Sequence, residues 1–130
     1  MSGALPRFDN LVVLLVETQI TTVEAVKQCL KGTGAIVMRV ASLQTAGERL
    51  SFIAPDIVIT NLQLCEENGF ILLKQVRAYE RSLNRTQIPM IAIADYSDVE
   101  GEIALAAGFQ AYIRTPIAAN SLYATLRRFI

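Results

Sequence analysis

Five short apolar runs along the chain constrain its fold more than any other feature. The first, residues 11–16 (LVVLLV), is unbroken, as expected of a strand buried on both faces of a parallel sheet. The other runs follow at intervals that leave room for a crossover helix between successive parallel strands. They are residues 35–40, 56–60, 90–94 and 111–113.

Helical patterns fill the segments between these runs. Thr21 with Glu24, and Ser97 with Glu100, have the spacing of a capping box, which predicts that a helix begins at each pair. Five strands that alternate with five helices predict a doubly wound α/β sandwich, in which helices cover both faces of a parallel sheet. The remaining helices are predicted over residues 42–53, 69–81 and 119–129.

Composition restricts the class of function. The chain has 130 residues, 52% of them hydrophobic, and twelve Lys and Arg against twelve Asp and Glu, so it lacks the basic excess typical of nucleic-acid or membrane-surface binding. It has no histidine, the commonest general base and metal ligand. The chain has only two cysteines and no apolar run long enough to cross a membrane, which predicts a cytoplasmic protein. Residues 1–10 are predicted to form a flexible lead, and residues 11–130 one domain.

Four segments resemble, in order and spacing, the receiver domains of two-component response regulators. They are residues 13–18 (VLLVET), 55–70 (PDIVITNLQLCEENGF), 88–97 (IPMIAIADYS) and 106–117 (AAGFQAYIRTPI). The resemblance implies a flavodoxin-like (CheY-like) three-layer (βα)5 fold with strand order 2-1-3-4-5. It also implies a functional site where the carboxyl ends of the strands meet.

The residues that carry phosphoryl transfer in this family are substituted here. The nucleophile is an Asp, but Asn61 stands at its position, and a carboxamide cannot form an acyl phosphate. The acidic pair that holds Mg²⁺ is reduced to Glu17 and Thr18, so Mg²⁺ binding is expected to be lost or very weak. Ala94 replaces the switch hydroxyl, and Thr115 replaces the phosphate-binding Lys.

Two features of the family's frame are kept. Tyr112 matches the aromatic switch position. Thr115 and Pro116 match the Lys-Pro pair, for which the resemblance suggests a cis peptide bond. We therefore expect a pseudo-receiver with no catalytic residue, no metal site and no cofactor.

Such a module is expected to act in a two-component phosphorelay by protein–protein interaction and not as an enzyme. The expected partner is a histidine kinase, an output domain, another regulator, or a second copy in a homodimer. Neither nucleic acid nor a membrane is expected as a partner. The resemblance places the partner surface between the fourth helix, the fifth strand and the fifth helix. Its candidate residues are Tyr96, Ile103, Tyr112, Leu122 and Tyr123.

Other interpretations stay open at this point. The crevice at the strand ends could bind a small molecule. The chain could be a receiver domain excised from a larger sensor kinase or regulator, or a receiver phosphorylated on Asp56 or Glu17 instead. Carboxylates near the site could also form a residual cation site, for which the candidates are Glu17, Glu66, Glu67 and Asp95.

Overall fold

The computed structural model describes residues 5–64, 67–84, 87–94 and 98–130. Its main sheet contains β1 (Val12–Val16), β2 (Ile36–Val40), β3 (Ile57–Asn61), β6 (Met90–Ala94) and β7 (Ala111–Arg114). These strands are parallel and lie in the order β2-β1-β3-β6-β7, which confirms the predicted order 2-1-3-4-5. A short antiparallel pair, β4 (Gln63–Leu64) and β5 (Glu67–Asn68), follows β3.

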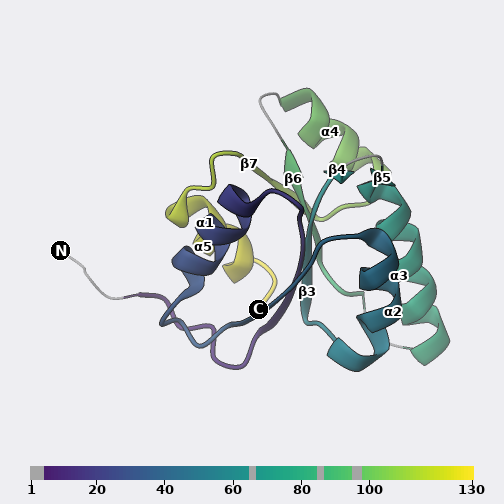
Figure 1. Ribbon diagram of the computed structural model, residues 1–130, viewed down its shortest axis with the longest axis horizontal. Helices are drawn as coiled ribbons and strands as arrows, with labels where there is room; N and C mark the ends of the chain where they lie inside the picture. Colours follow the sequence, from purple (N-terminus) through teal and green to yellow (C-terminus); the bar gives the residue numbers. More distant parts are fainter. Residues whose placement is uncertain (1–4, 65–66, 85–86, 95–97) are drawn as a thin grey trace.

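Helices cover both faces of the sheet, as predicted. They are α1 (Ile20–Leu30), α2 (Leu43–Ile53), α3 (Gly69–Leu83), α4 (Asp98–Ala107) and α5 (Ala119–Arg127). Figure 1 shows α1 and α5 on one side of the sheet and α2, α3 and α4 on the other. Within the described residues, no helix combines the length and apolar character that crossing a membrane requires.

Strand β1 lies between β2 and β3 and contributes to the core on both faces of the sheet. Successive side chains of a strand point to opposite faces, so Val13 and Leu15 pack with α1 and α5, while Leu14 and Val16 pack under α2 and α3. All four side chains are fully buried. The unbroken apolar run therefore predicted the environment of this strand correctly.

The second strand is less buried than its apolar run predicts. Ile36 is 45% exposed and Met38 is 40% exposed, whereas Val40, on the same face, is buried. Strand β2 is an edge strand, and α2 packs against α3, so the helix covers only the Val40 end of this face. An apolar run alone does not distinguish an edge strand from a central one.

The first helix does not begin with the predicted capping box. Its N-cap is Gln19, whose side chain makes no capping hydrogen bond, and Thr22 is buried within the helix. The Glu17 carboxylate accepts hydrogen bonds from the backbone N–H groups of Thr18 and Gln19 just before the helix begins. The Glu17 carboxylate therefore binds the backbone donors that precede α1, and Thr21 is not the N-cap of this helix.

The second helix begins as predicted, because the Ser42 hydroxyl accepts a hydrogen bond from the Thr45 N–H at 3.1 Å. The other predicted capping box begins at Ser97, which lies outside the described residues.

The flexible lead predicted over residues 1–10 is wrong for its last part. Phe8 is only 3% exposed and lies in the core beside Tyr123. The backbone N–H groups of Phe8 and Asn10 donate to the carbonyl oxygens of Thr33 and Gly34, at 2.8 and 3.0 Å. This segment is therefore held by the turn that follows α1.

A charged network fixes the start of β6. Arg77 of α3 forms an ion pair with the buried Glu80 at 2.9 Å and donates to the carbonyl oxygen of Ile88. It also donates to the side-chain oxygen of Gln110, which accepts from the Met90 N–H. Arg77 therefore has a structural role inside the fold.

Replacing Phe8 by Ala is expected to lower the free energy of unfolding by about 3 kcal/mol, because it leaves a cavity under α5. The matched control is Arg7→Ala, an exposed neighbour whose loss should change stability by less than about 0.5 kcal/mol. Urea unfolding of both variants measures the difference. Equal stabilities would show that the segment does not contribute to the core.

Candidate functional site

Two polar side chains meet at the centre of the sheet edge where parallel strands end. Glu17 follows β1 directly, and Asn61 is the last residue of β3, which lies next to β1. Glu17 is fully buried and Asn61 is 6% exposed. Because the carboxyl ends of parallel strands lie at the same edge, residues 44 positions apart in sequence come into contact.

The contact is a pair of hydrogen bonds from the Asn61 amide to the Glu17 carboxylate. Asn61 Nδ2 lies 2.9 Å from Glu17 Oε2 and 3.2 Å from Oε1. An ionised carboxylate can only accept hydrogen bonds, so the amide presents its NH₂ group and not its oxygen. The Asn61 amide therefore donates toward both oxygens of the Glu17 carboxylate.

Backbone donors complete the surroundings of the same carboxylate. Oε1 of Glu17 also accepts from the N–H groups of Thr18 and Gln19, at 2.9 and 3.0 Å. A carboxylate has about four lone-pair sites in all. Both oxygens of Glu17 therefore have donors, which satisfies the requirement that a buried charge be hydrogen-bonded.

The described residues at this edge do not form a carboxylate cluster of the kind that holds a divalent cation. Mg²⁺ prefers an octahedral set of oxygen ligands that includes carboxylates, and here it would have to displace the Asn61 amide from Glu17. Across the ranges that the structure describes, no group of three or more Asp, Glu, Cys or His side chains could hold a metal ion. Of the candidate residual cation site, Glu66, Asp95 and the Glu67 side chain lie outside the described part.

Arg39 is a site residue that the sequence interpretation missed. Its Nε donates to the backbone carbonyl of Glu17 at 3.0 Å, and its Nη2 lies 3.5 Å from the carbonyl oxygen of Thr18. The side chain thus reaches from β2 across the end of β1 and holds the backbone that carries the carboxylate. Its position in the otherwise apolar strand at 36–40 was the available signal.

The turn after Asn61 is held by Gly69 at the start of α3. The Gly69 N–H donates to the carbonyl oxygen of Leu62 at 2.9 Å. A Cβ at this position would overlap the carbonyl oxygen of Asn61, so only glycine allows α3 to begin so close to the end of β3.

The positions that match the switch hydroxyl and the lysine lie at the ends of the next two strands. Ala94 ends β6 and pairs with Arg114 of β7, and its side chain is outside the described part. Thr115 follows β7, and its peptide bond to Pro116 is cis, as the resemblance suggested. Both lie at the carboxyl edge of the sheet, where they were predicted.

A small hollow lies beside Thr115 at this edge. It measures about 290 Å³ and is bordered by the start of α1 and by Thr115–Ile117. None of the described residues that line it is charged. It is at the lower limit of ligand sites, which span about 300–1,000 Å³, so it gives the small-molecule interpretation little support.

The alternative phosphoacceptor Asp56 lies at the opposite end of the sheet. It precedes β3, and its Oδ2 accepts a hydrogen bond from the Val12 N–H at 2.8 Å. Five strand residues separate it from the carboxyl edge, roughly 16 Å. Asp56 therefore does not belong to this site.

Tyr112 is half-buried and its ring lies against α4. A Cβ at Gly101 would overlap ring atoms of Tyr112, so the absence of a side chain at Gly101 makes room for the ring. The ring packs against the core cluster on that side of the sheet. The predicted aromatic switch position is thus occupied by a ring held between strand and helix.

Part of the predicted partner surface is exposed. Ile103 of α4 is 53% exposed, and Val99, one turn earlier, is 62% exposed. Tyr112 is only partly accessible, and Tyr96 lies outside the described residues. Val99 could have been found from its i, i+4 spacing to Ile103.

The two α5 residues assigned to that surface are wrong. Leu122 is fully buried in the core between the sheet and α1. The Tyr123 hydroxyl donates to the carbonyl oxygen of Cys29 at 2.6 Å, so this side chain faces α1 and not α4. Burial also raises the pKa of the Cys29 thiol, which keeps it protonated near neutral pH.

The chain is similar to known proteins over most of its length. Residues 13–127 match the family model of the response regulator receiver domain. The transcriptional regulatory protein ZraR of Escherichia coli (strain K12) is 28% identical over 121 residues, which are 92% of this chain and 26% of that protein. The chain therefore spans about a quarter of the length of the curated relatives it matches.

Solved structures share the fold. The receiver domain of the response regulator Ssk1 from Saccharomyces cerevisiae, crystallised with the histidine phosphotransfer protein Ypd1, has a TM-score of 0.82 at 18% identity and covers 94% of this chain and 90% of its own. The receiver domain of a sensor histidine kinase from Pseudomonas aeruginosa PAO1, with a magnesium ion in its active-site cleft, has a TM-score of 0.78 at 23% identity, covering 92% and 97%.

Replacing Asn61 by Asp is expected to lower the free energy of unfolding by about 3 kcal/mol at pH 7, because two buried carboxylates then touch. The deficit should shrink as the pH falls toward the ordinary carboxyl range, about pH 4, because one of the two carboxyls takes up a proton. Urea unfolding at several pH values measures it.

The matched control is the exchanged pair Glu17→Gln with Asn61→Asp, which keeps one carboxylate and one amide. This double variant should recover most of the lost stability at pH 7. If the single variant is as stable as the wild type, the amide–carboxylate contact contributes nothing to stability.

Proposed function

This chain belongs to the response regulator receiver domain family, and we propose that it is a non-phosphorylatable member that acts in a two-component phosphorelay through protein–protein contacts. The observation that carries the proposal is the Asn61 amide bound to the buried Glu17 carboxylate at the position of the phosphoacceptor.

The acceptor chemistry supports this proposal. Phosphorylation of a receiver requires a carboxylate oxygen that attacks phosphorus and becomes the bridging oxygen of an acyl phosphate. The Asn61 amide has no anionic oxygen, and its nitrogen lone pair is delocalised. Its NH₂ group is also engaged with Glu17, so the side chain is a donor to a carboxylate and not a nucleophile.

The charge balance at the strand ends supports it as well. A bound phosphoryl group carries about two negative charges, which receivers offset with a metal ion and a lysine. Here the carboxylate of Glu17 would lie beside it, and Thr115 occupies the lysine position. Arg39, a cation close to this edge, is bonded to the carbonyl oxygens of Glu17 and Thr18.

A partner would then bind without a phosphorylation step. The Ssk1 receiver domain was crystallised with a histidine phosphotransfer protein, and the Pseudomonas receiver domain is part of a sensor histidine kinase, which are precedents for the class of partner. The exposed α4 face with Val99 and Ile103 is the surface we assign to it. Output would follow the amount of the protein or of its partner, and the module would have no enzymatic activity.

The decisive experiment measures the intact mass of the protein after incubation with acetyl phosphate and Mg²⁺. The wild type should keep its mass, and so should Asn61→Asp. In that variant Ala94 still lacks the switch hydroxyl, and Thr115 still lacks the amine of the lysine. A receiver domain that has its acceptor Asp, treated in parallel, serves as the positive control.

A stable gain of one phosphoryl group in the wild type would contradict the proposal. Gain of the group in Asn61→Asp alone would show that the acceptor is the only function lost, and that the other substitutions matter little.

A further inference from the structure

Helix α4 buries only small residues in the part of it whose side chains the structure describes. Among residues 99–107, Gly101 and Ala104 alone are buried. Each of the other four helices buries two or more valines or leucines, as α2 does with Leu43 and Leu50. The favourable free energy of burial grows with the apolar area removed from water, and Gly and Ala supply the least. Burial of its own residues therefore stabilises α4 less than it stabilises the other helices.

The large apolar side chains of α4 point away from the sheet. Val99 is 62% exposed, Ile103 is 53% exposed and Leu105 is 44% exposed. At about 100° per residue, Val99 and Ile103 each lie about 160° around the helix from Gly101. A surface helix normally has its large apolar residues on the face toward the core. These side chains therefore do not hold α4 on the sheet.

An aromatic ring lies under α4. The Tyr112 ring of β7 occupies the space that a Cβ at Gly101 would take, and it packs against the core on that side of the sheet. A glycine within a helix lowers the equilibrium constant for helix formation about fourfold to fivefold relative to alanine. The residue that makes room for the ring thus also weakens the helix.

The chain is anchored again directly after α4. Phe109 is 3% exposed, and its ring lies edge-on to Phe70 of α3 with 5.8 Å between the ring centroids. The Gln110 N–H donates to the carbonyl oxygen of Met90 at 2.9 Å. Gly108, between the helix and this anchor, has a φ of +122°, which glycine adopts without strain. Opening of α4 would therefore end at Phe109 and leave the sheet intact.

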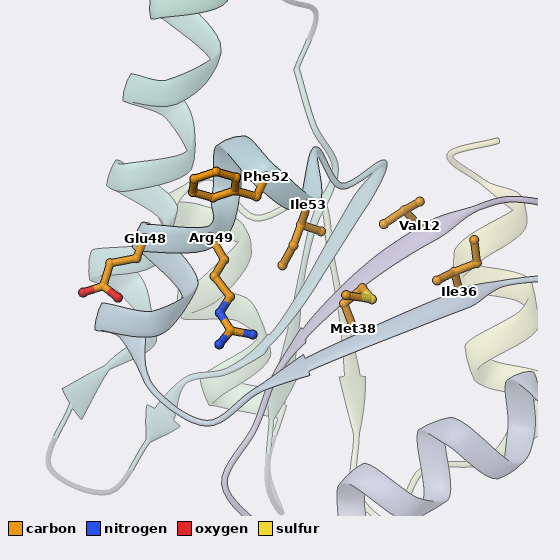
Figure 2. Close-up of a pocket in the computed structure, with 7 residues that line it drawn as sticks. All are labelled: Val12, Ile36, Met38, Glu48, Arg49, Phe52 and Ile53. Atoms are coloured by element: carbon orange, nitrogen blue, oxygen red, sulfur yellow. The ribbon is translucent and has the colours of Figure 1, made fainter.

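Helix α2 provides a comparison within the same chain. It has 11 residues against 10 in α4, and each helix contains one glycine. Like α4, it carries an exposed apolar side chain, because Phe52 is 85% exposed and lines a groove between β2 and α2 (Figure 2). It differs in burying Leu43 and Leu50 on its other face. The two helices therefore differ mainly in what each one buries.

We propose that α4 is a local opening unit of the fold, closed by the contact between Tyr112 and Gly101. It unfolds and refolds while the sheet and the other four helices stay native. Cooperative units with few buried apolar contacts open at a lower free energy than the whole domain. One consequence rests on the proposed function: a partner that binds Val99 and Ile103 on the closed helix would also reduce its opening, so the two equilibria would be linked.

Native-state amide hydrogen exchange of the free chain, followed by NMR at several low concentrations of denaturant, tests the proposal. After correction for intrinsic rates, the amides of residues 102–107 should exchange at least about 100-fold faster than those of β1 and β3. Their exchange should depend little on denaturant, because opening one helix exposes little surface. The amides of residues 47–53 in α2 and that of Gln110 should exchange at least about tenfold more slowly than those of α4.

Equal protection and equal denaturant dependence in α4 and in the central strands would overturn the proposal. The experiment uses the free chain, so its outcome does not depend on whether a partner exists or whether the chain can be phosphorylated. Failure of this inference and failure of the proposed function are therefore distinguishable.

Matched glycine-to-alanine variants test the closing contact. Gly101→Ala places a methyl group against the Tyr112 ring, so the α4 amides should exchange at least about tenfold faster, although alanine favours a helix. Gly47→Ala meets only the end of the Gln75 side chain, at 3.4 Å or more, so the α2 amides should exchange about fourfold to fivefold more slowly. Unchanged or slower exchange of α4 in Gly101→Ala would contradict the role of Tyr112.

Discussion

A buried carboxylate at the end of β1 is the constraint on which the candidate site depends. Glu17 is fully buried, and an isolated charge there would destabilise the fold by several kcal/mol. The amide of Asn61 and the backbone N–H groups of Thr18 and Gln19 supply its donors. One set of contacts thereby joins β1 to β3, shapes the start of α1 and occupies the oxygens that a metal ion would need.

The strands could be predicted because burial on both faces produces unbroken apolar runs in the sequence, and their order was expected from the resemblance to receiver domains. The unbroken run of β1 is visible in adjacent residues, whereas the cis Thr115–Pro116 bond was expected from the resemblance. The placement of Glu17 and Asn61 at one edge of the sheet could also be predicted, since the carboxyl ends of parallel strands meet there. The pairing of Glu17 with Asn61 was not predicted, because it depends on side-chain directions at two strand ends 44 residues apart.

Errors arose where tertiary packing chose between neighbouring residues. On α5 a step of one residue turns a side chain by about 100°, and this separates buried Leu122 from Tyr123, which bonds to Cys29 on α1. The exposure of Ile36 and Met38 depends on where α2 lies over β2, and periodicity within either element does not specify that. Phe8 was assigned to a flexible segment for the same reason, since only the fold brings Thr33 and Tyr123 to it.

In the proposed non-phosphorylatable receiver, the Asn61 amide takes the place of a cation on Glu17. Titration of the protein with Mg²⁺, followed by ¹H–¹⁵N NMR of the Asn61 side-chain amide and the backbone amides of Thr18 and Gln19, tests it most directly. These signals should not move at millimolar Mg²⁺, because the carboxylate already has its donors. A saturable shift of the Asn61 amide together with these two backbone amides would show that a metal ion displaces the amide, and would contradict the account.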